Sequence, residues 1–275
     1  MKILVTLILI IGYSYCYSQP NCNIFLLAND KATYNACEFV TNHKNDYYQF
    51  DWRQMEIWEK AIEMSPRLAY PMREFGVPYL KAGNFVKWKI YIDKAVKLDP
   101  HEYLGVRGSL KCKFVADYEG AIKDIDDYQL LLSGNDIGPS HDGTYHLNII
   151  NGLSYKALGK IDKAIEVFEE QMTKRDHMLG SYDMLHLGVL YTATGNYNKA
   201  IEQLNNQINE YDIAENRYYL AKAYRGLGEQ LSWQKHIQIA KEYILNNRTM
   251  EDSYNELFDK VYIEDIEHEL NKEWR

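Results

Sequence analysis

The chain has 275 residues, of which 46% are hydrophobic and 25% charged, and its formal net charge at pH 7 is −8. This length suits one large domain or one continuous array of repeats. The acidic balance argues against a nucleic-acid partner, which needs a basic stripe, and against an anionic membrane surface, which needs a polybasic patch.

Residues 1–18 have the pattern of a secretory signal peptide. Lys2 is the only charged residue in this stretch, and residues 3–11 are apolar except for one threonine. Cys16 and Ser18 supply the small side chains that signal peptidase accepts three and one positions before its cut. The apolar run is too short to cross a bilayer, which takes about 20 apolar residues, and no later stretch approaches that length.

We therefore expect export across the inner membrane and a mature chain that begins at Gln19 and is periplasmic or envelope-associated. A lipid anchor is the second interpretation. It ranks lower because a lipoprotein needs a small-residue box before its cysteine, whereas Cys16 follows Tyr15 and Cys22 lies well beyond the apolar run.

Residues 19–46 are expected to form an N-terminal cap segment. This segment contains two of the three cysteines that remain after cleavage. In an oxidising compartment, Cys22 and Cys37 are candidates for a disulfide, which would stabilise the cap by about 3 kcal/mol in the chain-entropy model. Whether they pair stays open at this point.

Residues 47–249 contain an internal repeat, which is clearest at residues 152–168 and 188–204. In both copies a Gly is followed three residues on by Tyr, seven on by Gly, twelve on by Ala and sixteen on by a large apolar residue. The first Gly lets a neighbouring helix approach closely, and the second accepts the left-handed conformation that ends a helix. The Ala and the apolar residue would pack in a second helix against the first.

This pattern resembles the tetratricopeptide repeat, which recurs about every 34 residues. The resemblance implies an all-α fold, an α-solenoid of helix-turn-helix repeats forming a right-handed superhelix. Weaker copies before and after the two clear ones bring the array to five or six repeats. The copies depart from the pattern at Pro78, where we expect a kink or an irregular turn, and at residues 133–143, a run of turn formers that predicts a loop insertion.

Three bulky or sulfur-containing side chains also replace repeat residues. Trp88 and Trp233 stand where the clear copies have Ala, and Cys112 stands where they have Tyr. We interpret Cys112 as a small buried apolar side chain and not as a reactive thiol.

Residues 250–275 are acidic and amphipathic. A solenoid leaves an apolar face on its last repeat, so we expect these residues to form a C-terminal capping helix. A partner-docking peptide is the second interpretation.

The chain contains none of the usual catalytic signatures, and no cofactor is expected. His141, Asp142 and His146 would be metal ligands only if the loop folded over, and their spacing is not that of a recognised zinc site. Solvated loop residues are the favoured interpretation. The carboxylates Asp124, Asp126 and Asp127 are expected on a solvated outer face, because adjacent helical residues do not point at the same place.

The family resemblance implies a concave groove lined by the first helix of each repeat. Transferring the groove positions to this sequence gives a set of mostly aromatic and basic side chains: Tyr70, Arg73, Tyr103, Lys113, His146, Lys156, Tyr182, Tyr218, Lys222 and Arg225. Recurring tyrosines suit an extended peptide or helix, since rings offer a large contact area with few rotors to freeze. The alternative is that these side chains pack on neighbouring helices or on the loop.

The first functional hypothesis is a non-enzymatic scaffold of the cell envelope that binds a segment of a partner protein in this groove. The Lys and Asn residues of the clamp by which co-chaperone members of the family hold a terminal carboxylate are absent, so that activity is not implied. The alternatives are a carbohydrate-binding envelope protein, in which the rings stack on sugars, and a metal-dependent hydrolase at residues 133–146. The sequence carries no signal for the oligomeric state.

Overall fold

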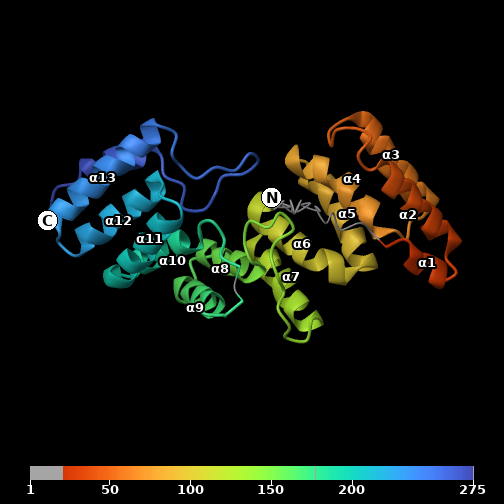
Figure 1. Ribbon diagram of the computed structural model, residues 1–275, viewed down its shortest axis with the longest axis horizontal. Helices are drawn as coiled ribbons and strands as arrows, with labels where there is room; N and C mark the ends of the chain where they lie inside the picture. Colours follow the sequence, from red (N-terminus) through yellow and green to blue (C-terminus); the bar gives the residue numbers. More distant parts are fainter. Residues whose placement is uncertain (1–20, 177, 275) are drawn as a thin grey trace, which may run out of the picture. The chain divides into compact units, whose positions relative to one another are not determined.

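The computed structural model describes residues 21–176 and 178–274. These residues form fourteen α-helices and one π-helix and contain no strand, so the all-α solenoid expected from the repeat is confirmed (Figure 1). The predicted signal peptide, residues 1–18, lies outside this range. Among the helices described, none is both long and apolar enough to cross a membrane.

The chain divides into two compact units, Met1–Phe75 and Gly76–Arg275. The helices of the first unit are α1 (Asn23–Leu27), α2 (Lys31–His43), α3 (Trp52–Met64) and the beginning of α4 (Ala69–Lys81). In α2 the side chain of Asp30 caps the helix by accepting from Thr33 N at 3.2 Å. A disulfide joins Cys22 to Cys37, with their Cα atoms 5.5 Å apart, and ties α2 to the residues just before α1.

Helix α4 passes through Pro78 and ends at Lys81. The irregular turn expected at Pro78 is therefore absent from this helix. Ala82 N donates to Pro78 O at 3.0 Å, so the carbonyl of the proline still accepts a helical hydrogen bond. The ring removes only the bond that its own nitrogen would have donated.

Beyond α5 (Phe85–Leu98), the second unit is built from consecutive helix pairs. These are α6 (Pro100–Leu110) with α7 (Tyr118–Leu131), α8 (Leu147–Ala157) with α9 (Ile161–Met172), α10 (Asp183–Ala193) with α11 (Tyr197–Glu210), and α12 (Ala214–Gly226) with α13 (Gln230–Leu245). The π-helix η1 (Lys111–Val115) continues α6.

The repeated residues are the contacts within each pair. A Cβ added to Gly152 would lie 2.6 Å from the Phe168 ring, and one added to Gly188 would lie 2.6 Å from Leu204. Phe168 and Leu204 are fully buried. The first Gly of the repeat thus faces the apolar residue that follows it by sixteen positions, and the two helices cannot pack this closely around any larger residue.

The other departures from the repeat are also buried. Trp88 and Trp233 lie in the core at 3% and 7% exposure, in positions where other copies have Ala. Cys112 is free and 3% exposed, and burial raises the pKa of its thiol to about 11. It is the inert apolar side chain that the sequence predicted.

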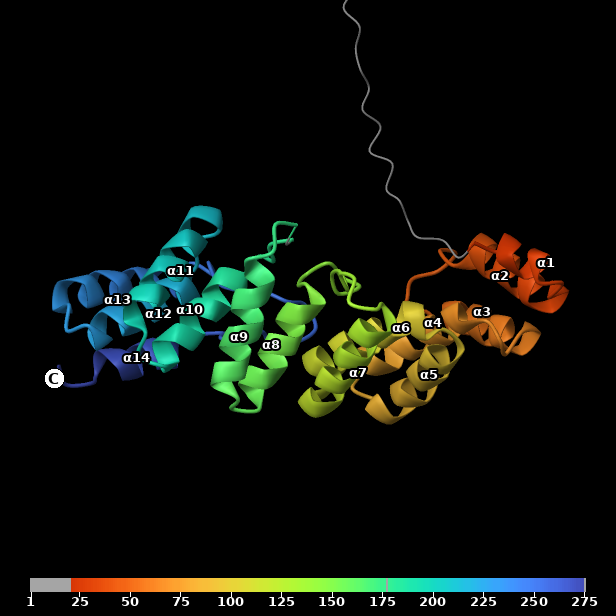
Figure 2. The same ribbon diagram turned by 90° about the horizontal axis from the view of Figure 1, so that it is seen from below.

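The C-terminal capping helix is shorter than residues 250–275. Only α14 (Ile263–Leu270) is helical, and its Ile266 packs with Trp233 and Ile237 of α13. Residues 250–262 form an extended loop, which Figures 1 and 2 show turning back along the second unit.

Candidate peptide-binding groove

The loop between α13 and α14 runs across the first helices of consecutive pairs. We call residues 250–262 the tail loop. Lys156 of α8, His186 of α10 and Glu215 of α12 each contact it. The surface that these three helices present to the tail loop is termed the inner groove. Figures 1 and 2 both show the tail loop lying along this part of the second unit.

Asp259 anchors the tail loop to two helices at once. Its carboxylate forms an ion pair with Lys156 Nζ and accepts a hydrogen bond from His186 Nδ1 at 2.7 Å. The side chain is only 6% exposed. Burial acts to raise the pKa of this carboxyl, but the charge of Lys156 and the hydrogen bond from His186 outweigh it and hold the pKa below its ordinary value. Asp259 is therefore ionised at neutral pH within a site that is nearly closed to water.

The backbone of Asp259 has a left-handed conformation, with a φ of 64°. Aspartate tolerates this region better than most residues, yet the conformation still costs free energy. Lys260 N donates to Leu257 O at 3.3 Å and closes a turn around Asp259. This turn places the carboxylate against α8 and α10.

His186 connects the tail loop to the loop insertion between α7 and α8. Its Nε2 lies 3.1 Å from the hydroxyl of Tyr145, which follows the insertion. Because Nδ1 donates to Asp259, we assign Nε2 as the acceptor of the Tyr145 hydroxyl. Tyr145 is 2% exposed, and burial raises the pKa of its phenol well above the ordinary value, so the phenol remains a donor.

Glu215 provides a second, oppositely charged anchor. Its carboxylate lies 3.2 Å from Lys260 Nζ and accepts from Met250 N at 3.1 Å. The Glu215 side chain is fully buried. The inner groove thus binds an acidic and a basic residue that are adjacent in the tail loop, each through a group of opposite charge: the partly buried Lys156 and the fully buried Glu215.

The tip of the tail loop reaches the N-terminal end of the second unit. Tyr254 lies under the ammonium of Lys81 at 4.0 Å from the ring centroid, and the ring centroids of Phe258 and Tyr118 are 6.1 Å apart. Tyr254 is nevertheless 51% exposed. A cleft remains open beside the tip, with these further residues in its lining: Leu80, Gly83, Phe85, Cys112, Lys113 and Phe114.

The loop insertion predicted at residues 133–143 folds onto α8. His146 caps that helix, since its Nδ1 accepts from Asn148 N at 3.1 Å, and its Nε2 lies 3.0 Å from Asp136. Asp142 pairs with Lys113 at 2.6 Å. Both ring nitrogens of His146 are therefore engaged within the protein. Across residues 21–176 and 178–274, no three His, Cys, Asp or Glu side chains come together in a metal-binding arrangement.

Of the predicted groove residues, those on α8 to α12 meet the C-terminal part of the chain. Lys156 binds Asp259, and Tyr182 hydrogen-bonds the backbone of Glu251. Arg225 pairs with Glu269 of α14 at 3.1 Å.

Tyr218 and Lys222 lie on α12 beside these residues. The ammonium of Lys222 is 5.5 Å from the Tyr218 ring centroid, and Tyr218 also packs in the cluster that includes Ile266 of α14. Their positions agree with an inner surface, but the surface is covered in part by the chain itself.

The remaining predicted residues are not brought into the inner groove. Lys113 and His146 bind the loop insertion, as described above. Tyr70 and Arg73 belong to the first unit, where Tyr70 packs edge-on against Trp58 with ring centroids 6.0 Å apart.

Tyr103, Tyr182 and Tyr218 are 7%, 9% and 8% exposed, so they offer little of the free ring face that sugar stacking requires.

Sequence reasoning missed His186 and Asp259. His186 lies two residues before Gly188, which is not one of the groove positions of the family. The available signal was a histidine within the otherwise apolar stretch of α10, a place where a buried ring needs a polar partner. Nothing local indicated Asp259, because its partner Lys156 is 103 residues away in the sequence.

Two potential nucleophiles near the inner groove, Cys112 and Tyr145, are not activated. The thiol of Cys112 and the phenol of Tyr145 are buried, and burial raises both pKa values. Neither is ionised at neutral pH, so neither is poised to attack a substrate.

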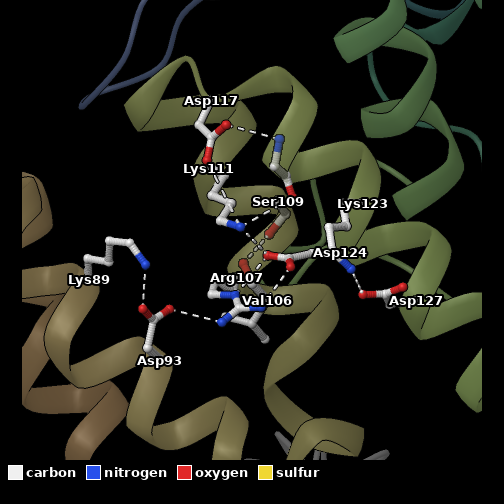
Figure 3. Close-up of polar contacts among 11 residues, drawn as sticks. Lys89, Asp93, Val106, Arg107, Ser109, Lys111, Asp117, Lys123, Asp124 and Asp127 are labelled. Carbon is white, nitrogen blue, oxygen red and sulfur yellow. Dashed lines mark hydrogen bonds and ion pairs between the residues drawn. The ribbon is translucent and has the colours of Figure 1, made fainter.

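A second group of charges lies between α5, α6 and α7 and corrects the prediction for Asp124. Its carboxylate is 2% exposed and accepts two hydrogen bonds from the Arg107 guanidinium, at 2.7 and 2.8 Å. Lys111 Nζ lies 2.8 Å from the same carboxylate, and Arg107 also pairs with Asp93 at 2.9 Å (Figure 3). Asp124 thus joins helices in the interior and does not lie on a solvated face.

The neighbouring carboxylates do not join this group. Asp127 pairs with Lys123 in the exposed manner expected, and Asp126 accepts from Asn151 Nδ2 at 3.0 Å. The three carboxylates point to three different partners, as the geometry of a helix requires. We interpret the buried group as structural, since its charges pair with one another.

The sequence and the fold were compared with those of known proteins. Residues 151–173 match the tetratricopeptide repeat. PilW, described as a widely conserved type IV pilus biogenesis factor, has a similar structure at 12% identity, with a TM-score of 0.57 over 80% of this chain and 92% of that one. PilF of Pseudomonas aeruginosa is similar at 13% identity, with a TM-score of 0.59 over 78% of this chain and 93% of that one. No curated protein matches the sequence.

At these identities the structural likeness establishes the fold alone. The matched segment, residues 151–173, includes Lys156 and the Ala and Phe of the clearest repeat copy. The chain contains a tetratricopeptide repeat and has the helical solenoid fold of tetratricopeptide-repeat proteins.

Proposed function

We propose that this tetratricopeptide-repeat solenoid is a non-enzymatic interaction scaffold of the cell envelope, and that its inner groove holds an extended segment of a partner protein. The observation that carries the proposal is the tail loop itself. The inner groove already binds an extended stretch of polypeptide through side chains of three successive inner helices. A surface with this property is suited to another segment of similar chemistry.

The envelope location is supported by two independent features. The signal-peptide pattern of residues 1–18 directs export, and the Cys22–Cys37 disulfide is stable in an oxidising compartment. The structurally similar PilW is described as a type IV pilus biogenesis factor. We draw from it only that a scaffold of this fold suits envelope assemblies.

Site-specific photo-crosslinking tests the proposal. A photoreactive amino acid is introduced at Lys222, which lies on α12 beside the inner groove, or at Lys199, which lies on α11 and is 61% exposed. The full-length protein is expressed in its native host and irradiated. We expect a distinct protein adduct from position 222 that is absent from position 199.

Two results would contradict the proposal. One is the same set of adducts from both positions, which would indicate random surface contact. The other is the absence of any protein adduct at position 222, which would mean that no partner contacts the inner groove.

A further inference from the structure

The inner groove is occupied by the chain's own tail loop, and this has consequences for what else it can bind. Resting on the proposed function, we propose that the tail loop is an internal ligand that competes with the partner, and that the partner segment carries a carboxylate in the position of Asp259. The occupant of the groove thus alternates between this chain's own loop and an acidic segment of another protein.

The need for a carboxylate follows from what the loop leaves behind. Lys156 is 16% exposed and His186 is fully buried, and both direct a polar atom at Asp259. A segment that covered the same surface without a carboxylate would bury the Lys156 ammonium without a counter-charge, which is costly. An apolar or basic segment would therefore not displace the loop. A segment with an aspartate or glutamate at this point would restore both contacts.

A cation next to that carboxylate would add to recognition. Lys260 follows Asp259 directly and pairs with Glu215, whose side chain is fully buried. The Asp-Lys pair of the loop therefore meets the groove with both charges matched, and a partner segment that keeps this order would match both anchors.

The loop also has properties expected of a ligand that can leave. Residues 251–262 belong to no helix or strand, and residues 251–254 are exposed. Asp259 is held in a left-handed conformation, and release from the groove would relieve it. The cleft beside Leu257 and Phe258 gives an incoming segment a place to make its first contacts.

The ends of the loop remain attached when its middle leaves. Helix α14 packs independently through Ile266 and through the Arg225–Glu269 pair at 3.1 Å. The loop therefore stays near the groove at a high effective concentration, and a partner must overcome this intramolecular competition. Binding would be weak until the loop is destabilised or the partner is abundant.

A labelled peptide with the sequence of residues 250–262 measures this competition in the full-length protein. Wild-type protein is expected to bind it weakly, because its own loop occupies the groove. The Asp259→Asn protein keeps Lys156 and His186 but loses the anchor of its own loop, and should bind the same peptide at least about tenfold more tightly. A peptide carrying the Asp259→Asn change is the matched control and should show no such gain.

A second variant guards against a fold defect in the first. Lys260→Glu places a like charge beside Glu215 and releases the loop without altering either group that binds Asp259. It should also increase affinity for the wild-type peptide, and circular dichroism should show unchanged helix content. Adding Lys156→Met to Asp259→Asn should abolish the gain.

The proposal is overturned if both loop variants bind the peptide no better than wild type, or if the control peptide binds equally well. It is also overturned if light scattering shows that the wild-type chain is a dimer and the Asp259→Asn chain a monomer, because the loop of a second copy would then be the occupant. If the loop variants bind the peptide more tightly but no partner is crosslinked in the host, the tail loop is an internal ligand and the proposed scaffold function is refuted. A partner captured equally by wild type and Asp259→Asn would refute the competition alone.

Discussion

Ala116 is a residue at which the α6–α7 pair differs from its neighbours. At Gly159 and Gly195 the helix ends in a left-handed residue, with φ values of 71° and 75°. Ala116 adopts the same conformation with a φ of 55°, directly after the π-helix Lys111–Val115. The sequence has no glycine here, and the structure shows that the turn is kept at a cost in backbone strain.

Replacing Ala116 with glycine should stabilise the protein. The left-handed conformation costs an alanine about 1–2 kcal/mol, and part of that gain is offset by the greater freedom of glycine in the unfolded chain, leaving a net of about 0.5–1 kcal/mol. Urea denaturation measures the change. Ala193→Gly is the control, because Ala193 is exposed and helical, and it should destabilise by a similar amount. A loss of stability for both variants would contradict this account.

His236 should make the protein sensitive to mild acid. It is 8% exposed, stacks on Tyr224, and its Nδ1 lies 3.3 Å from the Arg217 guanidinium. Burial, followed by the charges of Arg217 and Lys235, lowers its pKa from 6.5 to about 4. As pH falls below 6.5 the unfolded chain gains a proton here that the folded chain does not. Stability is lost through this window, and the loss is complete below the folded pKa.

The effect is measured as the difference in unfolding free energy between wild type and His236→Gln at pH 7 and at pH 4. Wild type should lose about 3 kcal/mol more than the variant, because folding lowers the pKa of His236 from 6.5 to about 4. If wild type and His236→Gln lose stability in parallel, His236 is not the acid-sensitive group.

At the scale of elements, the helix pairs were predictable and their charged contacts were not. The spacing of Gly152 and Phe168 is a local pattern that one pair satisfies by itself, so it appears in the sequence. Asp124 is buried because Arg107 and Lys111 come from the preceding helices and reach its carboxylate. The residues around Asp124 are acidic, as on a solvated face, and no local pattern distinguishes the one that turns inward.

The tail loop was missed for a related reason. Its spacing of apolar residues indicated a helix, and α14 does form from Ile263–Leu270. The preceding residues instead take their conformation from contacts with Lys156 and His186, far away in the chain. The groove positions transferred from the family include Lys156, but they gave no indication of the chain segment that covers it.

Removing Asp124 should be far more harmful than removing an exposed charge on the same helix. Asp124→Ala leaves Arg107 and Lys111, which are 18% and 15% exposed, without their shared carboxylate. We expect a loss of about 3 kcal/mol in the free energy of unfolding. Lys123→Ala breaks an exposed pair with Asp127, so it should cost far less. Equal effects in thermal or urea unfolding would place Asp124 outside the structural core.

At the scale of the whole molecule, the sequence indicated one continuous array over residues 47–249, whereas the structure divides into Met1–Phe75 and Gly76–Arg275. The boundary falls inside α4, which the repeat pattern runs through without a break. A boundary of this kind depends on how many contacts cross it, and a pattern of small and apolar residues does not record that. The first unit is the smaller one, and it carries the disulfide.

The Cys22–Cys37 disulfide should therefore set the stability of the first unit. The bridge spans 15 residues of sequence, and a loop of this length corresponds to about 3 kcal/mol in the chain-entropy model. Replacing both cysteines with serine should speed hydrogen exchange of the α2 amides by roughly a hundredfold, because exchange there follows opening of the small unit. The amides of α10 serve as the internal control, since each helix pair of a solenoid is stabilised by its own neighbours and α10 lies several pairs away. Equal acceleration of exchange in α2 and α10 would show that the protein opens as one cooperative body. Unchanged exchange in both helices would show that contacts such as the hydrogen bond between Thr33 and Ser65, at 2.7 Å, hold the first unit together without the disulfide.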